Sequence, residues 1–207
     1  MPRQFHFRSG CARFHLLLLL VLSALFGPSQ AMPAPEQKAA KFEIAFMTDM
    51  IAHHQMAVMT SEMCLARADH TELRAMCEQI IATQRTEIAT LTMWLHNWYG
   101  LTPETPEMTR KEQKDMATLE TLYGAEFEIE FMKSMIRHHF GAIIDSSQCL
   151  RRASHSELIT MCQGIITTQA AEIRKLQTWL CDWYGICNYG PRRPEMIDPE
   201  RHSWLDH

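Results

Sequence analysis

Residues 50–54 read Met-Ile-Ala-His-His, and the chain repeats this stretch as Met-Ile-Arg-His-His at residues 135–139. The offset of 85 residues aligns residues 42–100 with residues 127–185 without a gap, and 32 of the 59 aligned positions are identical. Because a single unit of this length cannot bury its apolar face alone, the two copies are expected to pack against each other.

Each copy has the pattern of two consecutive amphipathic helices, with apolar residues at steps of three and four. In the first copy the pattern predicts one helix that starts at Phe42 and a second that ends at Gly100, because glycine commonly follows a helix. Thr71 is the expected N-cap of the second helix. Residues 32–41 contain two prolines and are expected to be a loose lead-in. The second copy repeats the hairpin, with Gly185 as its terminator.

Residues 101–126 connect the two copies, and Thr109 with Glu112 has the pattern of a capping box for a short helix there. Two antiparallel hairpins that pack together make a four-helix bundle. We therefore expect an all-α fold, a ferritin-like four-helix bundle made of two repeated antiparallel helical hairpins with a long, partly helical crossover. This bundle forms a single domain over residues 32–187. Residues 188–207 contain three prolines and are expected to be an extended or disordered tail.

The first 31 residues have the features of a secretory signal peptide. Three arginines precede an apolar run of about eleven residues at 16–26, which is too short to span a bilayer, and Ser-Gln-Ala at 29–31 is a small-x-small cleavage site. We expect cleavage after Ala31 and an exported mature protein, periplasmic or secreted. No second apolar segment reaches membrane length, so no membrane partner is expected after cleavage.

The charge of the chain argues against nucleic acid and anionic membranes as partners. The full chain has 20 Lys and Arg against 24 Asp and Glu, and without the three arginines of residues 1–31 the formal charge falls from −4 to −7. No basic run remains that could contact phosphates. A negative chain of this kind is compatible with a cationic partner such as a metal ion.

The cysteines predict disulfides. Seven cysteines become six when Cys11 leaves with the signal peptide, and an even number in an exported protein favours disulfides over free thiols. In an antiparallel hairpin, residues equally distant from the turn lie at one level. This rule predicts a Cys64–Cys77 bridge, and a Cys149–Cys162 bridge as its copy. Two further cysteines remain, and whether they pair with each other around the end of the last helix is left open: Cys181 and Cys187.

The same rule places His54 level with Glu87, with Gln84 and Met50 each one helical turn away. The candidate metal-binding residues are Met50, His53, His54 and Glu87 in the first copy and Met135, His138, His139 and Glu172 in the second, with Met47, Gln84 and Gln169 as weaker candidates. One interpretation is a His–Glu hydrogen bond that fixes the helix register. The other is a metal bound by imidazole and thioether groups, with the carboxylate as a ligand or as a partner that orients the imidazole.

Thioether sulfur with imidazole, in an oxidising compartment, favours copper as the metal, and Cu(I) over Cu(II), although another transition metal is possible. A ferritin-type di-iron centre is disfavoured because neither copy has the Glu-x-x-His motif. Three further methionines occur only in the first copy, on the helix face opposite His54: Met56, Met59 and Met63. They predict either a packing or interface surface or a Cu(I)-binding thioether surface. If they bind Cu(I), the first copy holds it more tightly than the second.

The pattern Met50-Ile51-x-His53-His54-x-x-Ala57, followed by Gln84-x-x-Glu87-Ile88 and Trp94-Leu95, resembles the family called domain of unknown function 305. The resemblance covers both copies, roughly residues 42–185. It implies a ferritin-like helical bundle and, for some members, export with copper binding or copper tolerance. The family often has Met at the positions that are Thr60, Asp145, Leu91 and Leu176 in this chain.

The leading hypothesis is an exported protein that buffers or delivers copper, or confers tolerance to it, with another exported copper protein as a candidate partner. One alternative is a disulfide-stapled helical interaction module whose buried His and Glu are structural. The other is a metal-dependent redox enzyme. No Ser-His-Asp or Cys-His nucleophilic pattern is visible in the sequence, so an enzyme is not the leading hypothesis. Stoichiometry, oligomeric state and the choice between storage and delivery are left open.

Overall fold

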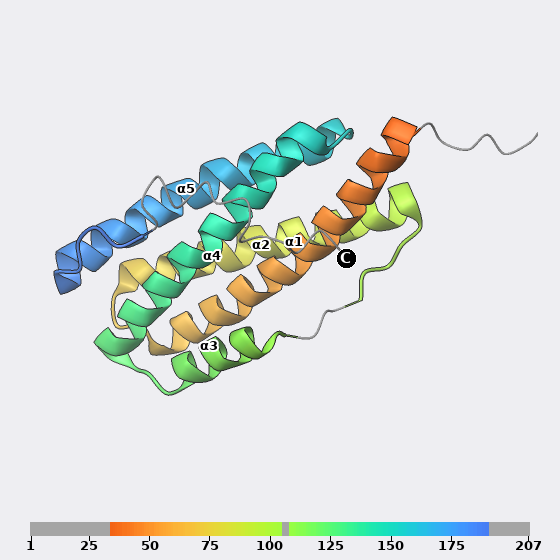
Figure 1. Ribbon diagram of the computed structural model, residues 1–207. Coiled ribbons are helices and arrows are strands. Elements are labelled where there is room, and N and C mark those ends of the chain that lie inside the picture. The colour runs from red at the N-terminus through yellow and green to blue at the C-terminus, as the bar shows by residue number, and fades with distance from the viewer. Residues whose placement is uncertain (1–33, 105–107, 191–207) are drawn as a thin grey trace, which may run out of the picture. The chain divides into compact units, whose positions relative to one another are not determined.

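The structure is a computed structural model, and it describes residues 34–104 and 108–190. The predicted signal peptide and the tail beyond residue 190 lie outside these residues. Within them the chain forms five helices and no strand: α1 (Ala34–Arg67), α2 (Thr71–Tyr99), α3 (Arg110–Glu120), α4 (Gly124–Arg152) and α5 (Ser156–Tyr184) (Figure 1). The all-α prediction is confirmed. None of the described helices is both long and apolar enough to cross a bilayer.

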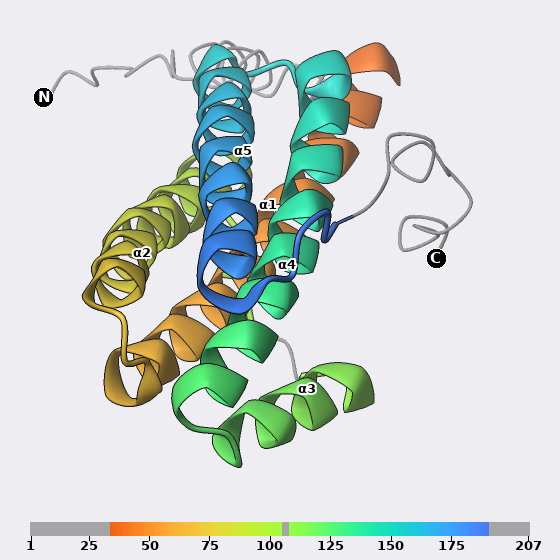
Figure 2. The same cartoon turned by 90° about the vertical axis from the view of Figure 1, so that its left-hand side faces the viewer.

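Two helical hairpins, α1–α2 and α4–α5, supply the four long helices of the fold. α1 also packs against α4, so these two helices join the hairpins. The short helix α3 packs against α1 and α4 (Figures 1 and 2). This arrangement is consistent with a ferritin-like four-helix bundle whose crossover is partly helical.

Helix α1 begins at Ala34, eight residues before the predicted start at Phe42. The expectation of a loose lead-in is therefore wrong from Ala34 onward. Pro35 lies in the first helical turn, where the backbone N–H that proline lacks has no helical partner in any case. The residues at 36–41, Glu-Gln-Lys-Ala-Ala-Lys, have high helix propensity, so the helix extends through them.

Helix α2 begins at Thr71, and its N-cap is His70, whose side chain makes no capping hydrogen bond. The N-cap prediction for Thr71 is therefore wrong. The acceptor comes from α4 instead: the carboxylate of Glu128 accepts the backbone N–H groups of Asp69 and His70, both at 2.7 Å. A local capping pattern could not show this, because the acceptor lies 58 residues away from His70 in the sequence.

Three other predicted helix boundaries agree with the structure. Gly100 and Gly185 follow α2 and α5 in the left-handed conformation, with φ of 69° and 68°. Thr109 and Glu112 form the capping box of α3. The first helix of the second copy, α4, begins at Gly124, three residues before the aligned repeat starts at residue 127.

Three disulfides join the described cysteines. Cys64–Cys77 and Cys149–Cys162 each link the two helices of one hairpin beside its turn, with Cα–Cα distances of 6.4 and 6.3 Å. Cys181–Cys187 closes a loop after α5. Within the predicted tail, Tyr189 packs beside one of the apolar clusters, and the side-chain amide of Gln177 on α5 donates to its backbone carbonyl at 2.7 Å.

The apolar core consists of two separate clusters. One combines α1 from Ala57 onward with α4 up to Ile136, and the other combines α1 up to Ile51 with α4 from Ala142 onward. Both His-His pairs lie on α1 and α4 in the interval between these clusters. The middle of the bundle is therefore a polar layer, and this layer is the candidate site.

Candidate metal site

Four buried polar side chains occupy the layer between the apolar clusters, and each has its repeat partner there: His54 with His139 and Gln84 with Gln169. None of the four is more than 2% exposed. A polar group buried without a hydrogen bond or a ligand costs free energy. Neither nitrogen of His54 or His139 has a well-formed hydrogen bond. Polar atoms without hydrogen-bond partners therefore lie in the most buried part of the bundle.

Glu87 and Glu172 approach these histidines from the other helix of each hairpin. Nε2 of His54 lies 2.8 Å from a carboxylate oxygen of Glu87, and Nε2 of His139 lies 2.8 Å from Glu172. The distance is that of a hydrogen bond, but the geometry does not meet the criteria of one, so we describe each pair as a close contact between imidazole and carboxylate. The carboxylate holds one edge of each imidazole and leaves Nδ1 without a partner.

The first histidine of each pair faces the opposite hairpin. The rings of His53 and His138 lie 3.6 Å apart, at an angle of 34°. Nε2 of His53 lies 3.1 Å from the backbone carbonyl of His138 and donates to it when that nitrogen carries the proton. Nδ1 of His53 then has a free lone pair, and it is buried without a partner. The two hairpins thus contact each other through the first histidine of each His-His pair.

Both of these histidines favour the neutral form. Burial lowers the pKa of His53 to about 3, with a further contribution from the nearby imidazoles of His54 and His139. Burial and the neighbouring imidazoles also hold the pKa of His138 well below its usual range. A neutral imidazole is the form that binds a metal.

The methionines fall into two groups. Met50 and Met135 are 2% exposed and lie one turn before His54 and His139 on the same helix face. Met47 is also buried, in one of the apolar clusters. By contrast, Met59 is 40% exposed, as expected for the helix face opposite His54. Its neighbours Met56 and Met63 are partly buried, and Met63 packs beside one of the apolar clusters.

The residues of the layer suit a soft metal better than a hard one. Among the described residues, no three His, Cys, Asp or Glu side chains form a ready-made metal site. The thioether groups of Met50 and Met135 lie one helical turn from His54 and His139, and thioether and imidazole groups are soft ligands. The buried imidazole nitrogens without partners lie in the same layer.

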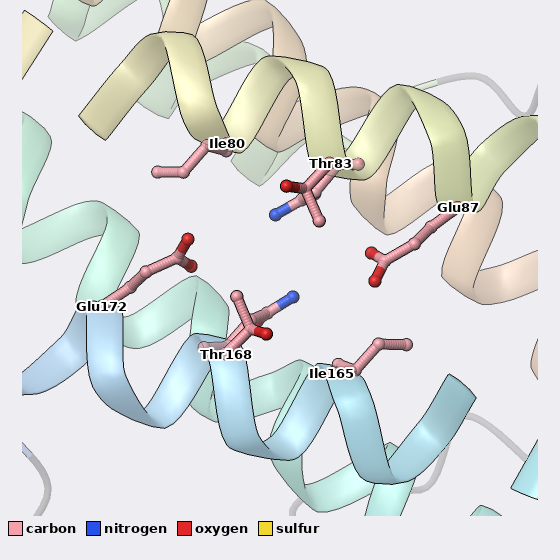
Figure 3. Close-up of a pocket in the computed structure, with 8 residues that line it drawn as sticks. Ile80, Thr83, Glu87, Ile165, Thr168 and Glu172 are labelled. Carbon is pink, nitrogen blue, oxygen red and sulfur yellow. The ribbon is translucent and has the colours of Figure 1, made fainter. Parts of the chain in front are cut away.

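A small cleft opens beside this layer between α2 and α5. Its lining consists of four residues and their repeat partners: Ile80, Thr83, Gln84 and Glu87 with Ile165, Thr168, Gln169 and Glu172. Figure 3 shows Glu87 and Glu172 directed into the cleft from opposite helices. Its volume is about 10 Å³, close to the room that one water molecule needs. Gln84 and Gln169 belong to this oxygen-lined cleft, and an amide oxygen is a poor ligand for Cu(I).

Sequence reasoning missed a second pair of buried carboxylates, Glu43 and Glu128, which are both fully buried. Glu43, on α1, accepts the backbone N–H of Ser154 and of His155 and also contacts the His155 ring and the Tyr99 hydroxyl. Glu128 makes the corresponding contacts around His70, including one with the hydroxyl of Tyr184. The alignment of the two copies could have indicated these residues, because each of these glutamates, histidines and tyrosines is identical in the two copies.

The fold and its layer define a class of duplicated helical-hairpin proteins with a His-His pair in each half. The family model of domain of unknown function DUF305 matches residues 43–180, and the chain belongs to this family. No curated protein matches the chain.

Solved structures of the family have the same fold. CopM in its Cu(I)-bound form is 30% identical with a TM-score of 0.63, and the match covers 69% of this chain and 98% of CopM. CopM in its Cu(II)-bound form is 29% identical, with a TM-score of 0.64 and coverage of 69% and 97%. A DUF305 protein from Streptomyces coelicolor, described as secreted, is 25% identical with a TM-score of 0.64, and the match covers 73% of this chain and 97% of that one.

Proposed function

We propose that this chain is an exported copper-binding protein that buffers or delivers Cu(I) or confers tolerance to copper, and that it is not an enzyme. The observation that carries the proposal is the set of buried imidazole nitrogens without partners at the middle of the bundle. The copper-bound structures of CopM support copper as the cargo. The signal-like sequence at residues 1–31 and the three disulfides support export.

Each side chain has a separate role in this proposal. His54 and His139 offer Nδ1 to the ion, while Glu87 and Glu172 hold the opposite ring nitrogen and fix the orientation of the imidazole. Met50 and Met135 supply thioether sulfur from one turn away. The His53 and His138 rings keep water out of the layer and offer further nitrogen lone pairs.

The test is a competition titration of the mature protein against a Cu(I) chelator. Substitution of both histidines of one pair, His53→Ala with His54→Ala or His138→Ala with His139→Ala, should lower Cu(I) affinity by at least about tenfold, because removal of a ligand costs no less than loss of its orienting partner. His96→Ala is the matched control, since His96 is exposed near the end of α2, and it should leave Cu(I) affinity unchanged.

A second experiment tests whether Met56, Met59 and Met63 form an additional Cu(I) site. The buried methionine sets of the two copies are equivalent, so a tighter first copy requires binding by Met56, Met59 and Met63. Their joint replacement by Leu lowers Cu(I) capacity if they bind the ion and leaves it unchanged if they only pack.

One observation favours a second candidate function. The 2.8 Å contacts of His54 with Glu87 and of His139 with Glu172 also suit buried pairs that fix the helix register, as in a disulfide-stapled interaction module. Circular dichroism and urea unfolding of the same variants separate the two functions. Unchanged Cu(I) affinity together with a large loss of stability would assign the histidines a structural role and refute copper binding in this layer.

A further inference from the structure

One disulfide differs from the other two in its exposure to solvent. The four cysteines of the two hairpin bridges are fully buried: Cys64, Cys77, Cys149 and Cys162. In the third bridge Cys187 is exposed and Cys181 is partly exposed. A thiolate must reach a sulfur atom directly in order to exchange with a disulfide. Of the three bridges between described cysteines, the native fold therefore leaves Cys181–Cys187 open to attack by a reductant.

The Cys181–Cys187 bridge has no counterpart in the first copy. At the offset of 85 residues the corresponding positions hold His96 and Thr102. The segments that follow the two helices also differ in burial. Leu101, after α2, is 42% exposed, whereas its repeat partner Ile186, inside the bridged loop, is partly buried and packs beside an apolar cluster. We attribute the closer packing of the second segment to the bridge, because the repeat alone does not produce it.

The bridged loop brings Tyr189 onto α4 at Arg137, the residue directly before the second His-His pair. Arg137 donates a hydrogen bond to the Tyr189 hydroxyl, and the ammonium group of Lys133 lies 5.7 Å from the centre of the Tyr189 ring. The side-chain amide of Gln177 on α5 donates to the backbone carbonyl. Such contacts at or near the surface each contribute little stability in water. Without the bridge, they hold this segment only weakly.

We propose that Cys181–Cys187 is a thiol-exchange site, which an external dithiol reduces while both hairpin bridges stay intact, and that its reduction frees residues 187–190 from the bundle. A thiolate of the dithiol attacks Sγ of the exposed Cys187, the disulfide bond breaks, and Cys181 leaves as a thiolate that takes up a proton. The second thiol of the reductant then attacks its own sulfur in the mixed disulfide and releases the Cys187 thiol. The protein gains two electrons and two protons, and the dithiol becomes a disulfide.

The test is graded reduction of the full mature protein with dithiothreitol under native conditions. New thiols are alkylated at successive times and located by mass spectrometry. Cys181 and Cys187 should be alkylated at least about tenfold faster than the four buried cysteines, because a buried bridge is reached only when its hairpin opens. Equal rates for the three bridges, or earlier reduction of a hairpin bridge, would overturn the assignment of the exchange site.

Limited proteolysis of the alkylated samples measures the release of the segment. Chymotrypsin should cleave after Tyr189 at least about tenfold faster once the bridge is reduced, because cleavage requires the segment to leave the bundle. Cleavage after Tyr123, which is 66% exposed between α3 and α4, is the internal control and should not change.

Cys181→Ser with Cys187→Ser removes the bridge without any reductant, and both hairpin bridges remain to hold the fold. This variant should be cleaved after Tyr189 as fast as the reduced protein, and dithiothreitol should not change the rate further. Slow cleavage after Tyr189 in either the reduced protein or the variant would show that the contacts of Tyr189 hold the segment by themselves, and would overturn its release by reduction.

Discussion

Glu43→Gln is the sharpest test of what holds the two hairpins together. Glu43 lies on α1 of the first hairpin, and its carboxylate accepts backbone N–H groups from the α4–α5 turn of the second. Gln has the same shape, but its NH₂ group cannot accept a hydrogen bond and the neutral side chain lacks the charge. The substitution therefore removes the ionic part of this link and leaves the packing in place.

The magnitude follows from the pKa of this carboxyl group. Burial by itself raises the pKa of Glu43, but hydrogen bonds from Tyr99, from the backbone of His155 and Ser154, and from the His155 side chain outweigh burial and lower the pKa from 4.5 to about 2. One pKa unit corresponds to ~1.4 kcal/mol, so the ionised form stabilises the fold by about 3 kcal/mol more than the neutral form does. Glu43→Gln should cost about that much at neutral pH.

The pH dependence has a definite sign. Because the folded pKa lies below the unfolded one, the stabilisation is complete above about pH 5 and is lost as the pH falls toward 2. The difference between the native protein and Glu43→Gln should thus shrink from about 3 kcal/mol at pH 7 to about 1.5 kcal/mol at pH 3.

Urea unfolding followed by circular dichroism, with the disulfides intact, measures both values. Glu128→Gln is the internal replicate, since hydrogen bonds also lower the pKa of Glu128 despite its burial, and the effect should have the same sign. A loss below about 1 kcal/mol at pH 7, or a loss that does not change with pH, would refute the assignment of the link to an ionised carboxylate.

Three further predictions concern the disulfides and two glycines, one that follows a helix and one inside a helix. The mature protein should contain no free thiol, because its six cysteines form three bridges, and two or more reactive thiols in a denaturing, non-reducing titration would contradict this. Gly100→Ala should destabilise the fold by about 1 kcal/mol, because a side chain disfavours φ of 69°. Gly164→Ala, in the interior of α5 with open space around it, should instead stabilise it by about 0.5–1 kcal/mol. Urea midpoints that shift in the same direction for both glycines would refute this account.

The candidate site could be predicted in part because its members share a hairpin. His54 and Glu87 lie on consecutive helices, and the antiparallel level rule brings such residues together without knowledge of the whole fold. The contact of His53 with His138 could not be predicted in this way, because it depends on how one hairpin lies against the other. The sequence grouped His53 and Gln84 with His54 and Glu87 as candidate metal-binding residues, whereas the structure directs His53 across the bundle and places Gln84 in the lining of the cleft.

The sequence by itself determined the all-α class, the two hairpins and their terminating glycines, because helical periodicity and capping depend on residues a few positions apart. The repeat added the equivalence of the two halves. Only the tertiary structure decided that Glu128, and not Thr71, caps the start of α2, that the core divides into two clusters, and that both Glu87 and Glu172 face one cleft. These features join residues 58 or more positions apart, and the physical reason is packing between hairpins, which no local pattern in either copy encodes.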